Sequence, residues 1–515
     1  MEGYPKEKVK YLVEGFKYGF SIEFKGGNLN FKEYKNLQSA YDHPSVVDEK
    51  IKGELEAGRF IGPYDEQPFE RFKVSPIGLQ PKKKPGEFRL ITHLSHPRGN
   101  SVNSGIPEEL STVQYHNVCD AIRIIKEKGN NCYMAKTDIK TAFRLVPIHP
   151  DCYYLLGIKW RGKYYIDRNL AMGCSISCAL FEEFSTALQW IAQAKLGIKS
   201  MIHIIDDFLT INITKQSCRY DLEKFVRMCG DIGVPLAAEK TLGPSRVMEF
   251  AGIELDSSRM VATLPSSKIE KCINSLNSII AKTKVKLKEI QHVSGLLNFA
   301  CIVVYPGRPF LRRLYNLTVG LTNKHQAIKL NKEVKEDLSM WLKFLVEFNG
   351  KNFFMNDWWV TDKKLNLFTD SAKSIGYGAV FDREWFYGSW EEESKKLDIT
   401  TLEFYPILIA MLIWGQRIKN TNINIHTDNE ALVSIINKQT VKNNPYCLKL
   451  LRLFVLTCLQ QNICIRAYHI KGELNVLSDA LSRQQVARFR ELAPHMKPDP
   501  TPVPRSLSLQ TLLQT

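Results

Sequence analysis

The sequence predicts an α/β and α+β protein of several domains, and three observations lead to this prediction. The chain has 515 residues, 44% of them hydrophobic, which is enough for roughly three or four separate cores. Strand-like apolar runs alternate with helical stretches before residue 265 and again after residue 365, a pattern typical of mixed α and β architecture. In both regions carboxylates directly follow such runs, and a mainly helical stretch separates the two regions.

The charge and cysteine content indicate the class of protein. There are 70 Lys and Arg residues against 54 Asp and Glu residues, a formal net charge of +16. A folded protein this basic is expected to bind a polyanion, and a solvated basic surface is the alternative. The twelve cysteines lack paired C-x-x-C spacing, which predicts neither zinc nor disulfides and favours an intracellular protein. The longest apolar run, Pro406 to Trp414, is too short to span a bilayer, so no membrane partner is expected.

Periodicity and composition predict five segments. Residues 1–60 are a mixed, basic N-terminal extension, and residues 61–264 combine strands and helices. Residues 265–350 are mostly helical, and residues 351–485 form a second α/β unit. Residues 486–515 carry five prolines between Pro494 and Pro504, which predicts a disordered tail.

Two adjacent aspartates, Asp206 and Asp207, lie within the apolar run M-I-H-I-I-D-D-F-L-T-I, which favours a buried strand. Neighbouring carboxylates concentrate negative charge, which is costly unless a cation compensates it. Hard oxygen ligands suit Mg²⁺, while a D-D pair at the tip of a hairpin is the alternative. Asp138, in A-K-T-D-I-K-T-A-F, follows another strand-like run. It is the natural partner of Asp206, because two-metal catalysis uses carboxylates from separate strands.

Several segments resemble, in order, the motifs of reverse transcriptases. T-D-I-K-T-A-F is similar to motif A, R-N-L-A-M-G-C-S-I-S-C-A-L-F to motif B, and I-I-D-D-F to motif C. G-V-P-L-A-A-E-K-T resembles motif D, M-E-F-A-G-I-E-L motif E, and P-K-K-K-P-G-E-F-R-L-I the fingers hairpin. The resemblance implies a right-hand polymerase, with fingers and palm in residues 61–264 and a thumb and helical connection in residues 265–350.

The same resemblance implies roles for individual residues. Asp138, Asp206 and Asp207 would be catalytic carboxylates and, with Ile139, the metal-binding set. Phe143 lies five positions after Asp138, where the family places an aromatic gate against the 2′-hydroxyl; a core phenylalanine is the alternative. Arg and Lys side chains suit a triphosphate, and glycine leaves room for the backbone to approach a nucleotide. The other implied nucleotide-binding residues are Lys83, Lys84, Arg89, Met172, Gly173 and Lys240.

The chain departs from the family's pattern at two positions. Ile204 stands two residues before Asp206, where Tyr or Phe is usual, and Met172 stands where many relatives carry Gln or Phe. Neither change removes a metal ligand. Both concern the surface for nucleotide and primer, so they affect fidelity and processivity rather than the chemistry.

A second set of motifs resembles ribonuclease H and implies a ribonuclease H-like α/β domain. L-F-T-D-S-A-K-S-I-G-Y-G-A-V contains Asp370, T-T-L-E-F-Y-P-I-L-I-A contains Glu403, and I-N-I-H-T-D-N-E-A contains Asp428. A-Y-H-I-K-G-E-L-N-V-L-S-D-A-L-S-R is similar to the closing motif, with Asp479 as the fourth carboxylate and His469 as a helper near product release or, equally, a structural histidine. Four carboxylates can hold two Mg²⁺ ions around a scissile phosphate.

Together the resemblances cover about residues 70–483 and imply an RNA-directed DNA polymerase with ribonuclease H activity from a retrotransposon. Two Mg²⁺ ions in each active site, with Mn²⁺ as a substitute, and a location in the cytoplasm or nucleus are expected. The implied partners are an RNA template, a DNA primer, an RNA–DNA hybrid and deoxynucleoside triphosphates. M-G-C-S-I-S-C-A-L-F-E-E-F and H-I-I-D-D-F-L are most similar to DIRS-type elements, which insert by a tyrosine recombinase that would be a further partner; gypsy-type elements come next. A domesticated, catalytically silent nucleic-acid-binding protein and a host DNA-templated polymerase are the alternatives.

Overall fold

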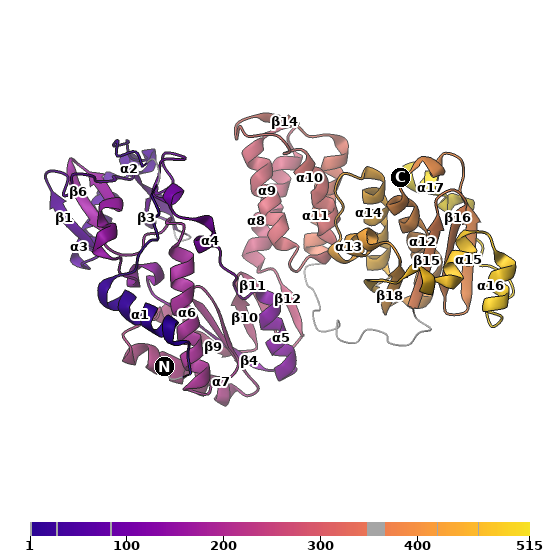
Figure 1. Cartoon of the computed structure of the whole chain (residues 1–515), viewed down its shortest axis with the longest axis horizontal. Coiled ribbons are helices and arrows are strands. Elements are labelled where there is room, and N and C mark those ends of the chain that lie inside the picture. Colours follow the sequence, from indigo (N-terminus) through magenta and orange to yellow (C-terminus); the bar gives the residue numbers. More distant parts are fainter. Residues whose placement is uncertain are drawn as a thin grey trace. The chain divides into compact units, whose positions relative to one another are not determined.

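The computed structural model describes residues 3–26, 29–82, 85–347, 366–419, 421–461 and 463–514. Figure 1 follows these residues along the chain, which divides into two compact units, Met1–Arg259 and Met260–Thr515. Lys83 and Lys84 lie outside the described residues, so their expected contacts with a triphosphate stay predictions.

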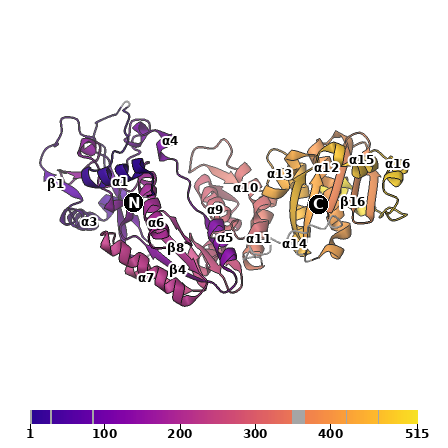
Figure 2. The same ribbon diagram turned by 60° about the horizontal axis from the view of Figure 1, so that its bottom comes forward.

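The first unit is built around an antiparallel sheet in the strand order β7-β8-β4-β9. Its strands are β4 (Tyr133–Asp138), β7 (Met201–Ile204), β8 (Asp207–Asn212) and β9 (Leu242–Ser245). Helices α6 (Ser177–Ala194) and α7 (Lys215–Asp231) run beside the sheet (Figure 2) and share one apolar core with it. Helix α5 (Val118–Lys128) and strand β10 (Val247–Phe250) contact this sheet, while α4 (Glu108–Ser111) contacts α6 and β11 (Ile253–Asp256) pairs with β10.

Two further groups of strands complete this unit. One is a three-stranded sheet in the order β1-β6-β5, formed by Phe60–Tyr64, Lys163–Asp167 and Gly157–Trp160. The other is the hairpin predicted around the K-K-K-P-G-E turn, in which β2 (Ile77–Pro81) pairs antiparallel with β3 (Phe88–Thr92). The hairpin prediction is therefore confirmed.

The first 60 residues pack into this unit instead of forming a separate extension. They contain α1 (Lys6–Tyr18), α2 (Gln38–Asp42) and α3 (Pro44–Glu56). Leu12 and Phe20 belong to the core beneath the main sheet, and Val47 and Ile51 pack with Phe60 of β1. Burial of these apolar side chains stabilises the docked arrangement.

The second unit contains a mixed sheet in the order β17-β16-β15-β18-β19. Strands β15, β16 and β17 are antiparallel neighbours, whereas β15, β18 and β19 are parallel. One face packs against α12 and α14, and the other against α15 and α16, which gives three layers. The strands are Asn366–Ala372 (β15), Gly376–Phe381 (β16), Glu384–Ser389 (β17), Asn422–Thr427 (β18) and Cys464–His469 (β19). The helices are Ile399–Trp414 (α12), Glu430–Lys438 (α13), Pro445–Gln460 (α14), Val476–Ser482 (α15) and Val486–Leu492 (α16).

The mainly helical stretch precedes this sheet. Its elements are β12 (Val261–Thr263), α8 (Ser266–Ile280), β13 (Lys284–Lys286), α9 (Leu287–Ala300), α10 (Arg312–Asn316), β14 (Ala327–Lys329) and α11 (Lys332–Glu347).

One apolar helix differs from the sequence expectation. Within the described residues, one helical segment, Ile399–Ile418, is long and apolar enough to cross a membrane. However, 72% of its most apolar window is buried inside the protein. A helix buried on all sides in a core is apolar around its whole circumference. The composition of this helix is therefore weak evidence for a membrane span.

The prediction of a disordered tail is wrong. Helix α16 and helix α17 (Leu509–Gln514) flank the proline-rich segment and anchor it. The Phe489 side chain is 0% exposed, its ring centroid lies 4.8 Å from that of Trp385, and Leu509 is also buried. The prolines stop helices, but apolar residues on both sides supply enough burial to order the segment.

Replacing Phe489 with Ala should lower the free energy of unfolding by about 3–5 kcal/mol, because a fully buried aromatic ring leaves a cavity. Urea unfolding of the purified chain would measure this. Leu492→Ala is the matched control, since Leu492 lies in the same helix and is 49% exposed. Equal, small effects of both variants would contradict a packed tail.

Candidate active sites

Strand register brings the three predicted palm carboxylates together. Asp138 ends β4 and Asp207 begins β8, and the two are directly opposite in the antiparallel ladder. The backbone N–H of Ile139 donates to the carbonyl oxygen of Asp206 at 2.9 Å. Burial raises the pKa of Asp206, and the nearby charge of Asp138 adds to this effect. The side chains at 138, 206 and 207 therefore form one cluster of negative charge.

The turn that carries Asp206 is strained. Ile204 of β7 pairs with Asp207 of β8, so Ile205 and Asp206 form a two-residue hairpin loop. Ile205 has φ of 57° at the first loop position, where such turns usually place glycine. A β-branched residue in this left-handed region costs roughly 1–3 kcal/mol, so surrounding contacts must hold the turn in place.

Two lysines face these carboxylates. Lys240 Nζ donates to both carboxylate oxygens of Asp138, at 2.8 and 2.9 Å, and Lys136 Nζ lies 2.9 Å from Asp207 Oδ2. Lys240 is among the residues predicted from the sequence, whereas Lys136 is not. Its spacing of two residues from Asp138 was the available signal, since alternate residues of a strand share one face.

The chemistry of the donor set fits a divalent cation. Asp207 Oδ1 is buried and, among the described residues, has no hydrogen-bond partner. Burial raises the pKa of Asp207 to about 6 even though Lys136 lies beside it. Carboxylate oxygens of this kind are ligands that Mg²⁺ prefers. In the part of the chain that the structure describes, no three His, Cys, Asp or Glu side chains are already placed to hold a metal ion, and the two lysines supply the compensating charge.

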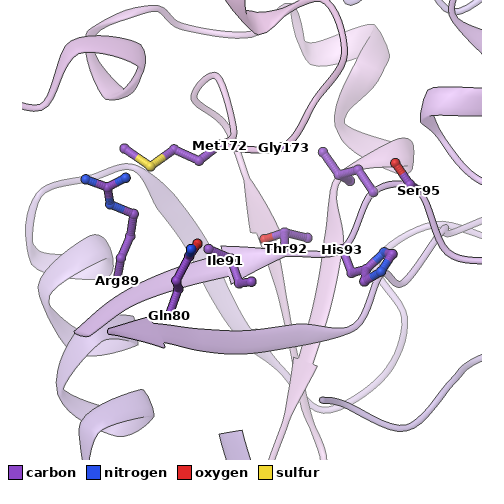
Figure 3. Close-up of a pocket in the computed structure, with 9 residues that line it drawn as sticks. Gln80, Arg89, Ile91, Thr92, His93, Ser95, Met172 and Gly173 are labelled. Atoms are coloured by element: carbon purple, nitrogen blue, oxygen red, sulfur yellow. The ribbon is translucent and has the colours of Figure 1, made fainter. Parts of the chain in front are cut away.

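A cavity of about 310 Å³ lies between the β2–β3 hairpin and the loop before α6. Figure 3 shows Arg89 of β3 and Met172 among the side chains that line it. Gly173 has φ of 104°, and a Cβ atom there would lie 3.2 Å from the carbonyl oxygen of Thr92. Asn103, which the sequence analysis missed, accepts from Ser175 N–H at 2.9 Å and donates to the carbonyl of Gly173 at 2.8 Å. No sequence signal marks Asn103, because its role depends on a contact across 70 residues.

Phe143 lies in the short turn Ala142–Leu145 that follows β4. Its ring is partly buried and packs edge-to-face on Phe181 with centroids 5.5 Å apart. The next residue, Arg144, is fixed by ion pairs to Glu54 at 2.8 Å and Asp167 at 2.9 Å. This network limits the movement of the turn that carries Phe143.

In the second unit, parallel strands bring Asp370 and Asp428 side by side. Phe368 of β15 pairs with His426 of β18, and each lies two residues before one of these aspartates. Glu403 projects from α12 and is 9% exposed, as is Asp370. Burial, followed by the charges of Asp428 and Asp370, raises the pKa of Glu403 to about 8. Burial also raises the pKa of Asp370 to about 6.

Helix α15 carries the fourth carboxylate, Asp479, to the same site. The helix approaches β16 closely, since a Cβ atom on Gly378 would lie 2.4 Å from Leu481 Cβ. Ser482 of the same helix hydrogen-bonds Asp370, and the charge of Asp479 contributes to the raised pKa of Asp370. Asp370 therefore lies close enough to each of the other three predicted carboxylates for their charges to interact.

Two further observations concern this second site. Asp428 Oδ1 is buried and lacks a hydrogen-bond partner within the described residues, which again fits a cation ligand. His469 is the last residue of β19 and pairs with Thr427, the residue that precedes Asp428. The His469 side chain is exposed.

The stability of the metal-free protein should fall with rising pH because of Glu403. Its pKa rises from about 4.5 to about 8 on folding, so its contribution is complete below pH 4.5 and is lost as the pH rises through 8. The expected slope within this window is at most about 1.4 kcal/mol per pH unit. Urea unfolding in a chelator should show a flatter profile for Glu403→Gln and an unchanged profile for Glu391→Gln, a variant of an exposed glutamate. If the parent, Glu403→Gln and Glu391→Gln showed parallel profiles of stability against pH, Glu403 would not be the buried, protonated group inferred here.

Comparison with known families identifies one domain. Residues 80–255 match the family model described as reverse transcriptase (RNA-dependent DNA polymerase). The Pro-Pol polyprotein of Simian foamy virus type 1 is 25% identical over 247 residues, which are 48% of this chain and 19% of that protein. The Pro-Pol polyprotein of Feline foamy virus is 21% identical over 274 residues, 53% of this chain and 21% of that protein. The matched region thus spans about a fifth of these relatives.

Solved structures with the same fold come from foamy viral protease-reverse transcriptases. One, designated dRH and in complex with ds DNA, has a TM-score of 0.51 at 17% identity and covers 91% of this chain and 80% of its own. Another, in complex with an RNA/DNA hybrid, has a TM-score of 0.51 at 15% identity. The match covers 92% of this chain and 61% of the other. The predicted fold class is confirmed: a right-hand polymerase followed by a helical connection and a ribonuclease H-like α/β domain. Residues 80–255 are thus similar to reverse transcriptases, and about half of the chain is similar to part of two Pro-Pol polyproteins.

Proposed function

We propose that this chain is an RNA-directed DNA polymerase with ribonuclease H activity, which copies retroelement RNA and degrades the RNA strand of the resulting hybrid. The observation that carries the proposal is the pairing of Asp138 with Asp207 across β4 and β8, with Asp206 in the adjoining turn. The basic character of the chain, with a net charge of +16, suits the phosphate backbones of both nucleic-acid strands.

In the first site, Asp138, Asp206, Asp207 and the backbone at Ile139 would hold two Mg²⁺ ions, with Mn²⁺ as a substitute. Bound ions would activate the primer 3′-hydroxyl and neutralise the triphosphate. Lys240 would then leave Asp138 and meet the pyrophosphate, because a lysine ammonium on a flexible stem suits a phosphate oxygen. Arg89 from the fingers hairpin, with Lys83 or Lys84, would bind the triphosphate.

The incoming sugar and base would lie near Phe143, Met172 and Gly173. The open backbone at Gly173 lets a nucleotide approach closely, and the Phe143 ring would exclude a 2′-hydroxyl by steric contact. The arrangement is supported by the cavity beside Arg89 and Met172.

In the second site, Asp370, Glu403, Asp428 and Asp479 would hold two Mg²⁺ ions around a scissile phosphate of the RNA strand. The raised pKa values of Glu403 and Asp370 fit groups that lose protons when a cation binds. His469, exposed next to this site, would assist product release.

The proposed partners are an RNA template, a DNA primer, an RNA–DNA hybrid and deoxynucleoside triphosphates. Foamy viral relatives solved with ds DNA and with an RNA/DNA hybrid support the nucleic-acid partners. The motif similarities favour a DIRS-type element with its tyrosine recombinase, acting in the cytoplasm or nucleus of the host cell. A domesticated protein that only binds nucleic acid is the competing outcome of the experiment below.

Paired variants should separate the two activities. Asp206→Asn should lower primer extension on RNA by roughly a thousandfold or more and leave cleavage of RNA in a hybrid nearly unchanged. Asp370→Asn should do the reverse, since the carboxylate sets lie on different sheets. Extension and cleavage are read on gels from the same preparation. Extension by Asp206→Asn at the parental rate would refute the polymerase site, and absence of both activities in the parental chain would favour the silent binding protein.

Phe143→Ala should lower the preference for deoxynucleotides over ribonucleotides by about tenfold or more, because truncating the ring opens space for the 2′-hydroxyl. The ratio of kcat/KM values for the two sugars measures this preference. Phe184→Ala is the matched control, since Phe184 also packs on Phe181, at 5.7 Å. An equal ratio in both variants would indicate that Phe143 is only a core residue.

A further inference from the structure

Polar contacts join helix α6 to strand β7 on both sides of a buried histidine. Gln193 Nε2 donates to the carbonyl oxygen of Met201 at 3.0 Å. At the other end of the strand, Ser185 Oγ donates to the carbonyl oxygen of Ile205 at 2.6 Å. The helix therefore holds the strand at its start and at the turn that precedes Asp206.

The middle contact is made by His203. Its Nδ1 is hydrogen-bonded to Gln189 Oε1 at 2.5 Å. Its Nε2 lies 3.1 Å from Glu182 Oε1, a charge contact without hydrogen-bond geometry. Positions 182, 185, 189 and 193 recur at helical spacing on α6. Their partners are Met201 and His203 of β7 and Ile205 in the turn that follows the strand. We refer to these contacts as the α6–β7 ladder.

The polar groups of the ladder are buried, and this burial lowers the stability of the fold unless the groups are hydrogen-bonded. Ser185 is 0% exposed and His203 is 2% exposed, and burying polar groups is unfavourable compared with apolar packing unless each finds a partner. The last contact of the ladder meets the one residue of this turn with a positive φ, Ile205. A branched side chain in that conformation persists only where its surroundings hold it.

We propose that Ser185 is a positioning residue that holds the strained Ile205 turn, so that Asp206 stays beside Asp138. The hydrogen bond fixes the carbonyl of Ile205, and the direction of that peptide sets the direction of the next residue. This inference rests on the proposed function of Asp206 as a metal ligand. It assigns Ser185 a role in the geometry of the carboxylates, without contact with substrate.

A double-variant cycle with Ser185→Ala and Ile205→Gly tests the proposal, because glycine adopts a positive φ without the Cβ penalty. Ser185→Ala should weaken Mn²⁺ binding to the protein alone, followed by electron paramagnetic resonance, by about fivefold or more. It should also lower kcat for primer extension by about tenfold, with less than about a twofold change in KM for the nucleotide. In the Ile205→Gly background the same serine substitution should change each quantity by less than about twofold.

Ser75→Ala is the matched control. Ser75 is also 0% exposed, and its hydroxyl has no hydrogen-bond partner in the described part of the chain, so Mn²⁺ affinity and rate should not change. The proposal is overturned if Ser185→Ala binds Mn²⁺ like the parent, or if its effect is equal in both backgrounds. It is also overturned if Ser185→Ala fails to fold and Ile205→Gly does not restore folding, since the hydroxyl would then support the fold and not the turn. Unchanged Mn²⁺ binding in Asp206→Asn would instead count against the proposed function.

Discussion

The structure depends on holding like charges together in buried surroundings. Asp138 and Asp207 face each other across a ladder, and like charges in directly opposite positions destabilise a sheet. Lys136 and Lys240 compensate them in the first site. In the second site the raised pKa of Glu403 means that protonation relieves part of the repulsion. The α6–β7 ladder contacts the strained turn that carries Asp206, and the close approach of α15 at Gly378 brings Asp479 near Asp370.

A buried ion-pair network connects helices α10 and α11 to helix α14 within the second unit. Asp337 of α11 is 0% exposed, and burial raises its pKa to about 6 despite two neighbouring arginines. Arg313 lies 3.4 Å from its carboxylate, and Arg452 of α14 forms the other ion pair. Removing one partner of such a network leaves an uncompensated buried charge. Helices α10 and α11 are therefore coupled to α14 of the domain that follows, although the sequence pattern separates them.

Low identity and a shared fold are compatible here for a physical reason. Foamy viral structures cover 91% of the chain at 17% identity, because a core requires apolar side chains of suitable size and spacing rather than particular ones. The candidate site restricts the sequence more strongly than the core does, since each carboxylate must occupy one position in the strand register.

The sequence by itself predicted local elements such as the β2–β3 hairpin, and it named the carboxylates that the structure brings together. The hairpin of β2 and β3 could be predicted in this way, because turn residues between apolar runs are a local signal. Only the tertiary structure decided that the first 60 residues and the proline-rich tail are packed, and that Lys136, Asn103 and Ser185 contact the candidate site. Asn103 and Ser175 are 72 residues apart, and Ser185 and Ile205 are 20 apart. Contacts at such separations depend on how strands and helices are brought together, and no local pattern encodes them.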